Sequence, residues 1–242
     1  MSKELHKYYL LPEEPEPYRT CKSKRFITKV MFLAAVARPR FDAAGNEEFL
    51  GKIGIFPFTF KELAKRSSKN RLASTMETKA IVSVTKDIYS SCLIEKVLPA
   101  IRSKWPHSSA TEPIYLQQDN AKPHISPLDA DFVEAGSKDG FNMRLLFQPP
   151  QSPDMNVLDL GYFRAIQFLQ HQEAPRTIDE LVHVVEKSFE EMSSDNLNRV
   201  FLSLQACMIE VMKSAKKFLM ALFKSSLKLL NREKATCSIV FL

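Results

Sequence analysis

The apolar positions of this chain fall into short runs separated by turn residues. Closely spaced apolar residues at 27–41 predict a long central strand with both faces covered. Turn chemistry around Gly45 and Asn46, followed by a second apolar run at 52–58, predicts a hairpin with that strand. Residues 61–80 are polar and basic, and we expect a loop over the surface there.

The rest of the pattern alternates helices with strands. The predicted elements are a helix at 86–104 kinked at Pro99, a strand at 114–118, a short helix at 128–138, a strand at 141–147, and helices that begin near Asn156 and Thr177. Thr177 and Glu180 have the spacing of a capping box. A hairpin followed by this alternation predicts an α/β fold, with a mixed sheet flanked by helices, of the ribonuclease H-like type.

The composition limits the kinds of partner and of cellular compartment that we expect. The chain has 242 residues, 45% of them hydrophobic, enough for one substantial core and a helical appendage. Its formal net charge of +6 favours a polyanion, although charge alone does not separate DNA, RNA and an acidic membrane. The four cysteines have no paired spacing, which indicates a reducing compartment and no zinc or disulfide framework. No apolar run approaches the roughly 18 residues of a transmembrane helix, and residues 1–7 are no secretory signal.

Two aspartates are the candidate catalytic and metal-binding residues. Asp119 follows the predicted strand at 114–118, and Asp159 lies near the start of a later helix. Carboxylates placed in this way can converge on one hard divalent ion, Mg²⁺ or Mn²⁺, which prefers oxygen ligands. Each also has a local interpretation: Asp119 with Asn120 is a common turn pair, and Asp159 could reach back to cap the helix at Asn156.

Other side chains could contact a substrate. His124, five residues after Asp119, could face phosphates or a hydrated metal, or could be a hydrogen-bonded structural residue. Four cations occur in seven residues, and we call them the basic run: Lys65, Arg66, Lys69 and Arg71. The basic run could contact DNA phosphates, serve as a nuclear-import patch, or be a solvated loop.

The residues around both aspartates resemble the catalytic domain of plant mariner-like DNA transposases, in the Tc1/mariner superfamily. The resemblance covers residues 7–212 and rests on matches in order at 8–14, 30–42, 51–58, 115–124 and 148–159. It implies a ribonuclease H-like fold and a triad of aspartates that holds two metal ions, with Asp119 and Asp159 as its last two members. It also implies DNA as partner, with a homodimer as an option, and the nucleus as location.

The first aspartate of that triad has no counterpart here. In the family it precedes the match at 8–14, inside an Asp-Glu-Lys-Trp-Phe segment, but this chain begins seven residues before Tyr8 and its one tryptophan is Trp105. We therefore expect a sheet without its first strand, weak metal binding and no DNA cleavage. Asp154 has the spacing of animal mariner transposases, yet its Ser-Pro-Asp triplet precedes the catalytic position, and we expect it to stabilise a turn and to point away from the site.

The expected organisation is a truncated core at 1–175, further core helices at 176–213 and a divergent basic tail at 214–242. Residues 217–230 predict a basic amphipathic helix, which could cover the core, contact a partner or bind weakly to a membrane surface. The tail could equally result from a shifted reading frame.

The expected function is DNA binding by a transposase-derived domain, with no small-molecule substrate and no membrane partner. The alternatives are a non-catalytic DNA- or protein-binding module and an unstable pseudogene product.

Overall fold

The computed structural model describes residues 29–67, 72–106, 112–170, 175, 177–214 and 239–242. At its centre is a five-stranded mixed sheet in the order β4-β1-β9-β7-β8. The bounds of these strands are Lys52–Pro57 for β4, Phe32–Ala37 for β1, Ile239–Phe241 for β9, Ile114–Gln118 for β7 and Met143–Phe147 for β8. The predicted α/β class, with a mixed sheet flanked by helices, is therefore confirmed.

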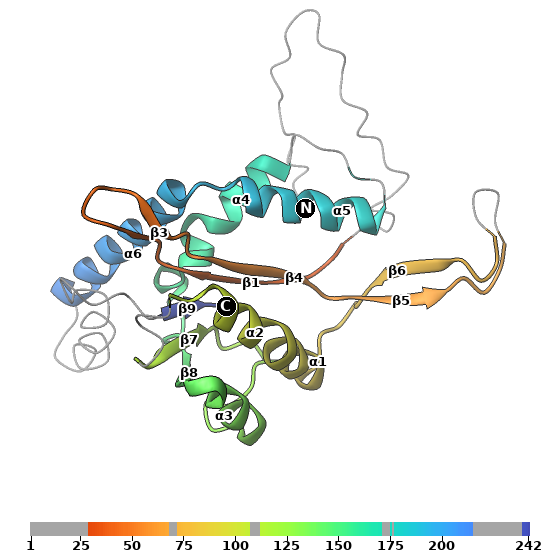
Figure 1. Ribbon diagram of the computed structural model, residues 1–242, viewed down its shortest axis with the longest axis horizontal. Coiled ribbons are helices and arrows are strands. Elements are labelled where there is room, and N and C mark those ends of the chain that lie inside the picture. Colours follow the sequence, from red (N-terminus) through yellow and green to blue (C-terminus); the bar gives the residue numbers. More distant parts are fainter. Residues whose placement is uncertain (1–28, 68–71, 107–111, 171–174, 176, 215–238) are drawn as a thin grey trace, which may run out of the picture.

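Helices cover both faces of the sheet, so that there are two cores. Figure 1 shows α1, α2 and α3 below the sheet and α4, α5 and α6 above it. The bounds are Lys86–Cys92 for α1, Leu98–Lys104 for α2, Ala130–Gly136 for α3, Phe163–Gln170 for α4, Ile178–Glu191 for α5 and Ser194–Ser214 for α6. Strand β1 alternates between the cores, with Leu33 in the lower one and Ala34 in the upper one. Among the described helices, none combines the length and the apolar character needed to cross a membrane.

Strands β1 and β4 form the predicted antiparallel hairpin, with Ala35 opposite Gly54. The strand predicted at 27–41 is shorter than expected over its described part, and its end at Ala37 fits Pro39, which offers no amide hydrogen for the ladder. The chain then continues into a small two-stranded ribbon of β2 (Arg40–Phe41) and β3 (Glu47–Phe49). Gly45 turns this ribbon with a positive φ of 86°, as the Gly45–Asn46 pattern predicted.

The predicted helix at 86–104 is present, but Pro99 is accommodated differently. The chain runs from α1 through a π-helical turn, η2 (Leu93–Val97), into α2. Pro99 has no amide hydrogen to donate one turn back, and the wider turn directly before it absorbs that irregularity. Thr85 begins the helix by accepting a hydrogen bond from the amide of Ile88 at 3.4 Å.

The prediction of a loop at 61–80 is wrong, because two strands lie there. Strands β5 (Thr59–Leu63) and β6 (Met76–Ala80) pair antiparallel, and Figure 1 shows them as an arm that extends away from the body. An ion pair of 2.7 Å between Lys79 and Glu62 joins the two strands. Strands exposed on both faces can carry many charges, so a polar composition did not distinguish this arm from a loop.

The C-terminal residues of the described chain lie inside the sheet. Strand β9 runs antiparallel to β1, with Val36 opposite Phe241, and parallel to β7, with Leu116 opposite Val240. The sheet expected to lack a strand therefore has one supplied by the tail, and residues 239–242 are not part of a helical appendage. The residues near β9 carry no sequence pattern that predicts this strand, because its partners β1 and β7 lie more than 100 residues away. The amphipathic helix predicted at 217–230 lies outside the described residues.

Candidate functional site

Asp119 and Asp159 line the same hollow. Strands β7 and β8 are parallel, so their carboxyl ends reach one edge of the sheet, and Asp119 follows β7 directly. Asp159 is on the π-helical turn η6 (Leu158–Tyr162), which leads into α4. The hollow has a volume of about 270 Å³ and we call it the aspartate hollow; its lining residues are Asp119, Asn120, Ala121, Gln148, Pro149, Gln151, Ser152, Pro153 and Asp159.

The two carboxylates interact electrostatically. Partial burial raises the pKa of Asp159, the negative charge of Asp119 raises it further, and a hydrogen bond with the side chain of Asn156 lowers it. The same Asn156 side chain accepts a hydrogen bond from the amide of Leu158 at 3.0 Å. The Asn156 side chain therefore links the amide of Leu158 to the carboxylate of Asp159. The Asn156 amide itself donates to the carbonyl of Pro153 at 3.1 Å, so the expected capping contact from Asp159 back to that amide is not found.

Asp119 is held by its own turn and by His124. Its Oδ1 accepts a hydrogen bond of 2.8 Å from the amide of Ala121. The Nδ1 atom of His124 lies 2.9 Å from that same Oδ1 and 2.9 Å from the carbonyl oxygen of Asp119. Both neighbours of Nδ1 are acceptors while Asp119 is ionised, so Nδ1 carries the proton. The His124 side chain is only 12% exposed, and these contacts are those of a residue that positions Asp119.

A buried network supports His124 from behind. The ring of Tyr89 lies against the imidazole with 4.4 Å between centroids. Its hydroxyl donates a hydrogen bond of 3.0 Å to Oε1 of Gln118, whose Nε2 donates to the carbonyl of Ile125 at 2.6 Å. Burial raises the pKa of Tyr89, and the charge of Asp119 adds to that effect. Sequence reasoning missed Tyr89 and Gln118, although two glutamines at the end of an otherwise apolar strand were an available signal.

Gln148 contributes an oxygen atom with no hydrogen-bond partner among the described residues. The residue is only 7% exposed and lines the aspartate hollow. Its backbone is held by two hydrogen bonds, from its own amide to the carbonyl of Gln118 at 2.7 Å and from Asn120 Nδ2 to its carbonyl at 2.8 Å. The side-chain Nε2 donates to the carbonyl of Ser152, whereas Oε1 is left unpaired. A buried unpaired carbonyl oxygen typically costs about 1–3 kcal/mol.

The donor set at the hollow contains only oxygen atoms. Two carboxylates suit a hard ion such as Mg²⁺ or Mn²⁺ better than zinc. Over the described part of the chain, however, no three His, Cys, Asp or Glu side chains form a group that could hold a metal ion. The neighbouring central strand offers Phe241 opposite Gln117, which is an apolar side chain rather than a third carboxylate.

The other predicted site residues lie elsewhere. Lys65 and Arg66 follow β5 on the arm and do not line the aspartate hollow. The Lys65 side chain is 84% exposed, with Glu62 at 3.7 Å. Lys69 and Arg71 lie outside the described residues. Asp154 is exposed in the 3₁₀ turn η5 (Pro153–Met155) and is not among the lining residues of the hollow.

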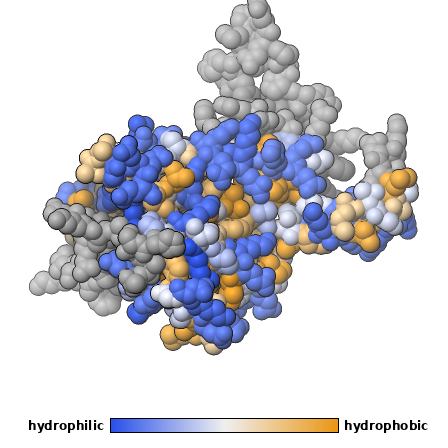
Figure 2. Space-filling view, in the orientation of Figure 1, coloured by the Kyte–Doolittle hydropathy of each residue, from blue (hydrophilic) through white to orange (hydrophobic). Residues whose placement is uncertain are grey.

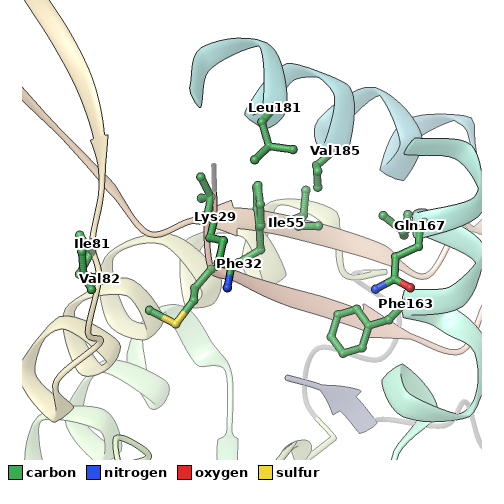
Figure 3. Close-up of a pocket in the computed structure, with 12 residues that line it drawn as sticks. Lys29, Phe32, Ile55, Ile81, Val82, Phe163, Gln167, Leu181 and Val185 are labelled. Atoms are coloured by element: carbon green, nitrogen blue, oxygen red, sulfur yellow. The ribbon is translucent and has the colours of Figure 1, made fainter. Parts of the chain in front are cut away.

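A larger apolar cavity was not predicted. It has a volume of about 700 Å³, lies between the start of β1, β4 and the helices α4 and α5, and shares no residue with the aspartate hollow. Figure 3 shows Leu181 and Val185 over Ile55, with Phe163 to one side. Among the described residues that line it, Lys29 is the one that carries a charge.

We compared the chain with protein-family models, with curated proteins and with solved structures, and none of the three comparisons produced a match.

Proposed function

We propose that this chain is a ribonuclease H-like catalytic domain of the mariner transposase type that now binds DNA without cleaving it. The observation that carries the proposal is the meeting of Asp119 and Asp159 at one hollow, with 39 residues between them in the sequence. Their charges interact through that space, which is the arrangement that the resemblance to plant mariner-like transposases implies. Local turn formation by Asp119 explains its contact with Ala121 but not its approach to Asp159.

The residues of the hollow fit a weakly held divalent ion. Asp119 and Asp159 would be its anionic ligands. His124 keeps Asp119 in one orientation by donating from Nδ1, so the carboxylate need not be ordered when an ion binds. When bound, Mg²⁺ or Mn²⁺ would activate a water or a 3′-hydroxyl and stabilise a leaving oxygen.

Among the described residues, the hollow offers two anionic ligands, and two are too few for strand cleavage in this scheme. Paired ions about 3.5–4 Å apart need a further shared carboxylate to compensate their charge. The described central strand offers Phe241 beside β7, and this side chain is buried in the core. A supporting partner alone is typically worth about 10–100-fold in metal affinity or activity, and a direct ligand should be worth more.

DNA binding would use the positive charge and not the carboxylates. The net charge is +6, and the arm carries Lys61, Lys65, Arg66 and Lys79. Lysine and arginine contacts to phosphates fix position on the duplex without reading its sequence. The nucleus is the corresponding location.

The test separates metal binding from cleavage. Mn²⁺ binding is measured by electron paramagnetic resonance for the unaltered chain, for Asp119→Ala and for the matched control Asp154→Ala. Weak binding that disappears only in Asp119→Ala supports the proposal, because Asp154 does not line the hollow. Equal binding by all three chains would remove the metal site.

The same three chains are then incubated with supercoiled plasmid and Mg²⁺. We expect no nicking above background in any of them. Robust nicking that disappears in Asp119→Ala would show that another residue replaces the missing ligand. DNA affinity measured by fluorescence anisotropy should be equal in all three, and absence of binding at low salt would refute the DNA-binding part.

A non-catalytic protein-binding module is the second candidate, and the arm favours it. Phe60, Leu63 and Met76 are each about half exposed on β5 and β6, and Figure 2 shows apolar residues along this arm. Exposed apolar side chains on a projecting ribbon are typical of a contact surface. Replacing Phe60 and Leu63 by Ser should leave DNA affinity unchanged if they serve a protein contact, and should lower it if they serve DNA.

A further inference from the structure

Strand β9 joins two halves of the sheet that do not otherwise pair. Among the described strands, β1 pairs with β4 on one side and β7 pairs with β8 on the other, and β9 lies between them. It is bonded to β1 at two residue pairs and to β7 at three. The amide of Leu242 extends the second ladder with a hydrogen bond of 2.9 Å to the carbonyl of Gln117. Without β9 both inner edges would expose unpaired backbone groups.

The space between β1 and β7, which we call the slot, also requires large apolar side chains. The β1 wall of the slot consists of Ala35, Val36 and Ala37, all fully buried. Val240 enters the lower core and Phe241 the upper one, where its ring meets that of Phe201 with 5.6 Å between centroids. One short strand therefore closes both cores and completes both ladders.

The covalent attachment of β9 is long. Helix α6 ends at Ser214, and residues 215–238 separate it from β9. A connection of this length can span up to about 80 Å when extended, so it does not by itself dictate which slot its strand enters. The partners of β9 lie more than 100 residues back in the sequence, so its pairing is non-local and depends on the two edges of the slot meeting the strand.

We propose that the slot is a strand-binding site that also accepts β9 from a second copy of this chain. Reciprocal exchange reproduces each ladder and each core contact of the closed chain, so the two forms differ only in their connections. A covalent tether supplies its own strand at an effective concentration of the order of millimolar. Closed monomers should therefore dominate in dilute protein, and exchanged dimers should form when chains refold together at high concentration.

Cysteine pairing across the ladder tests the exchange. Ala37 and Val240 are direct partners in the β1–β9 register. In chains whose native cysteines are replaced by Ser or Ala, the double variant Ala37→Cys/Val240→Cys should form a disulfide within one chain. A mixture of the two single variants, refolded together, should form a disulfide between chains that increases with protein concentration.

The control mixture replaces Val240→Cys with Val82→Cys, an exposed position that reports random collision. We expect at least about five-fold more crosslinked dimer in the test mixture than in the control, because an exchanged strand places residue 240 of one copy directly opposite residue 37 of the other. The proposal is overturned if the double variant closes on itself while the mixed single variants never exceed the control. It is overturned equally if the double variant forms no disulfide, because the strand is then not in the slot. Neither outcome depends on metal or DNA binding.

Discussion

The substitution Phe241→Ala tests whether the C-terminal strand is part of the folded core. Phe241 is 1% exposed and packs edge-on against Phe201. Removing a buried phenylalanine ring typically costs about 3–5 kcal/mol, because transfer energy is forfeited and a cavity is left behind. Since a domain is usually stable by only about 5–15 kcal/mol, this is a large share of the total.

The measurement is urea unfolding followed by circular dichroism. With a denaturant slope of about 3 kcal/mol per molar urea, the expected destabilisation lowers the midpoint by roughly 1–2 M. The matched control is Phe60→Ala on the arm, the same substitution at a side chain that is 46% exposed. That control should change the free energy of unfolding by less than about 1 kcal/mol.

A double-mutant cycle makes the result specific to the ring contact. Phe201→Ala alone should also be strongly destabilising, and the two substitutions together should be less than additive by about 0.5–1.5 kcal/mol. If Phe241→Ala costs no more than Phe60→Ala, then β9 is not seated between β1 and β7. The closure of the sheet and the exchange of strands would then both be refuted.

Further measurements address the site and the basic run. Asp119→Asn should lower the pKa of Asp159 in a carboxyl NMR titration, because a negative charge beside it is removed; an unchanged pKa would show that the two groups do not interact. The pKa of Asp159 is higher in the folded than in the unfolded chain, so the free energy of unfolding decreases as pH rises between the unfolded-state and the folded-state pKa. Asp119→Asn should make this decrease smaller. Tyr89→Phe should cost about 1–3 kcal/mol in urea unfolding, because Oε1 of Gln118 loses its donor, and a change near zero would contradict that bond. Neutralising the four cations of the basic run should make the slope of log DNA affinity against log salt concentration shallower by about 0.9 for each phosphate that the variant no longer binds. An unchanged slope would show that the basic run does not contact DNA and is either solvated or used in nuclear import.

Much of the local structure followed from the sequence. The apolar run at 114–118 became β7, the run at 52–58 became β4, and Thr177 caps α5 by accepting a hydrogen bond of 3.1 Å from the amide of Glu180. These features depend on neighbours a few residues away, so periodicity and capping chemistry are sufficient to predict them. The two aspartates were chosen for the same kind of reason, their positions relative to predicted strand ends.

Tertiary structure alone decided how those pieces meet. The role of His124 depended on the contact of its Nδ1 with Asp119 and of its ring with Tyr89. The unpaired oxygen of Gln148 depended on burial at the end of β8. The same is true of β9, which has three residues and no turn signal of its own. Its place comes from backbone groups and apolar space offered by β1 and β7, more than 100 residues earlier. The position of such a strand depends on the shape and the unpaired backbone groups of the slot. The sequence pattern of the strand itself gives no information about that slot.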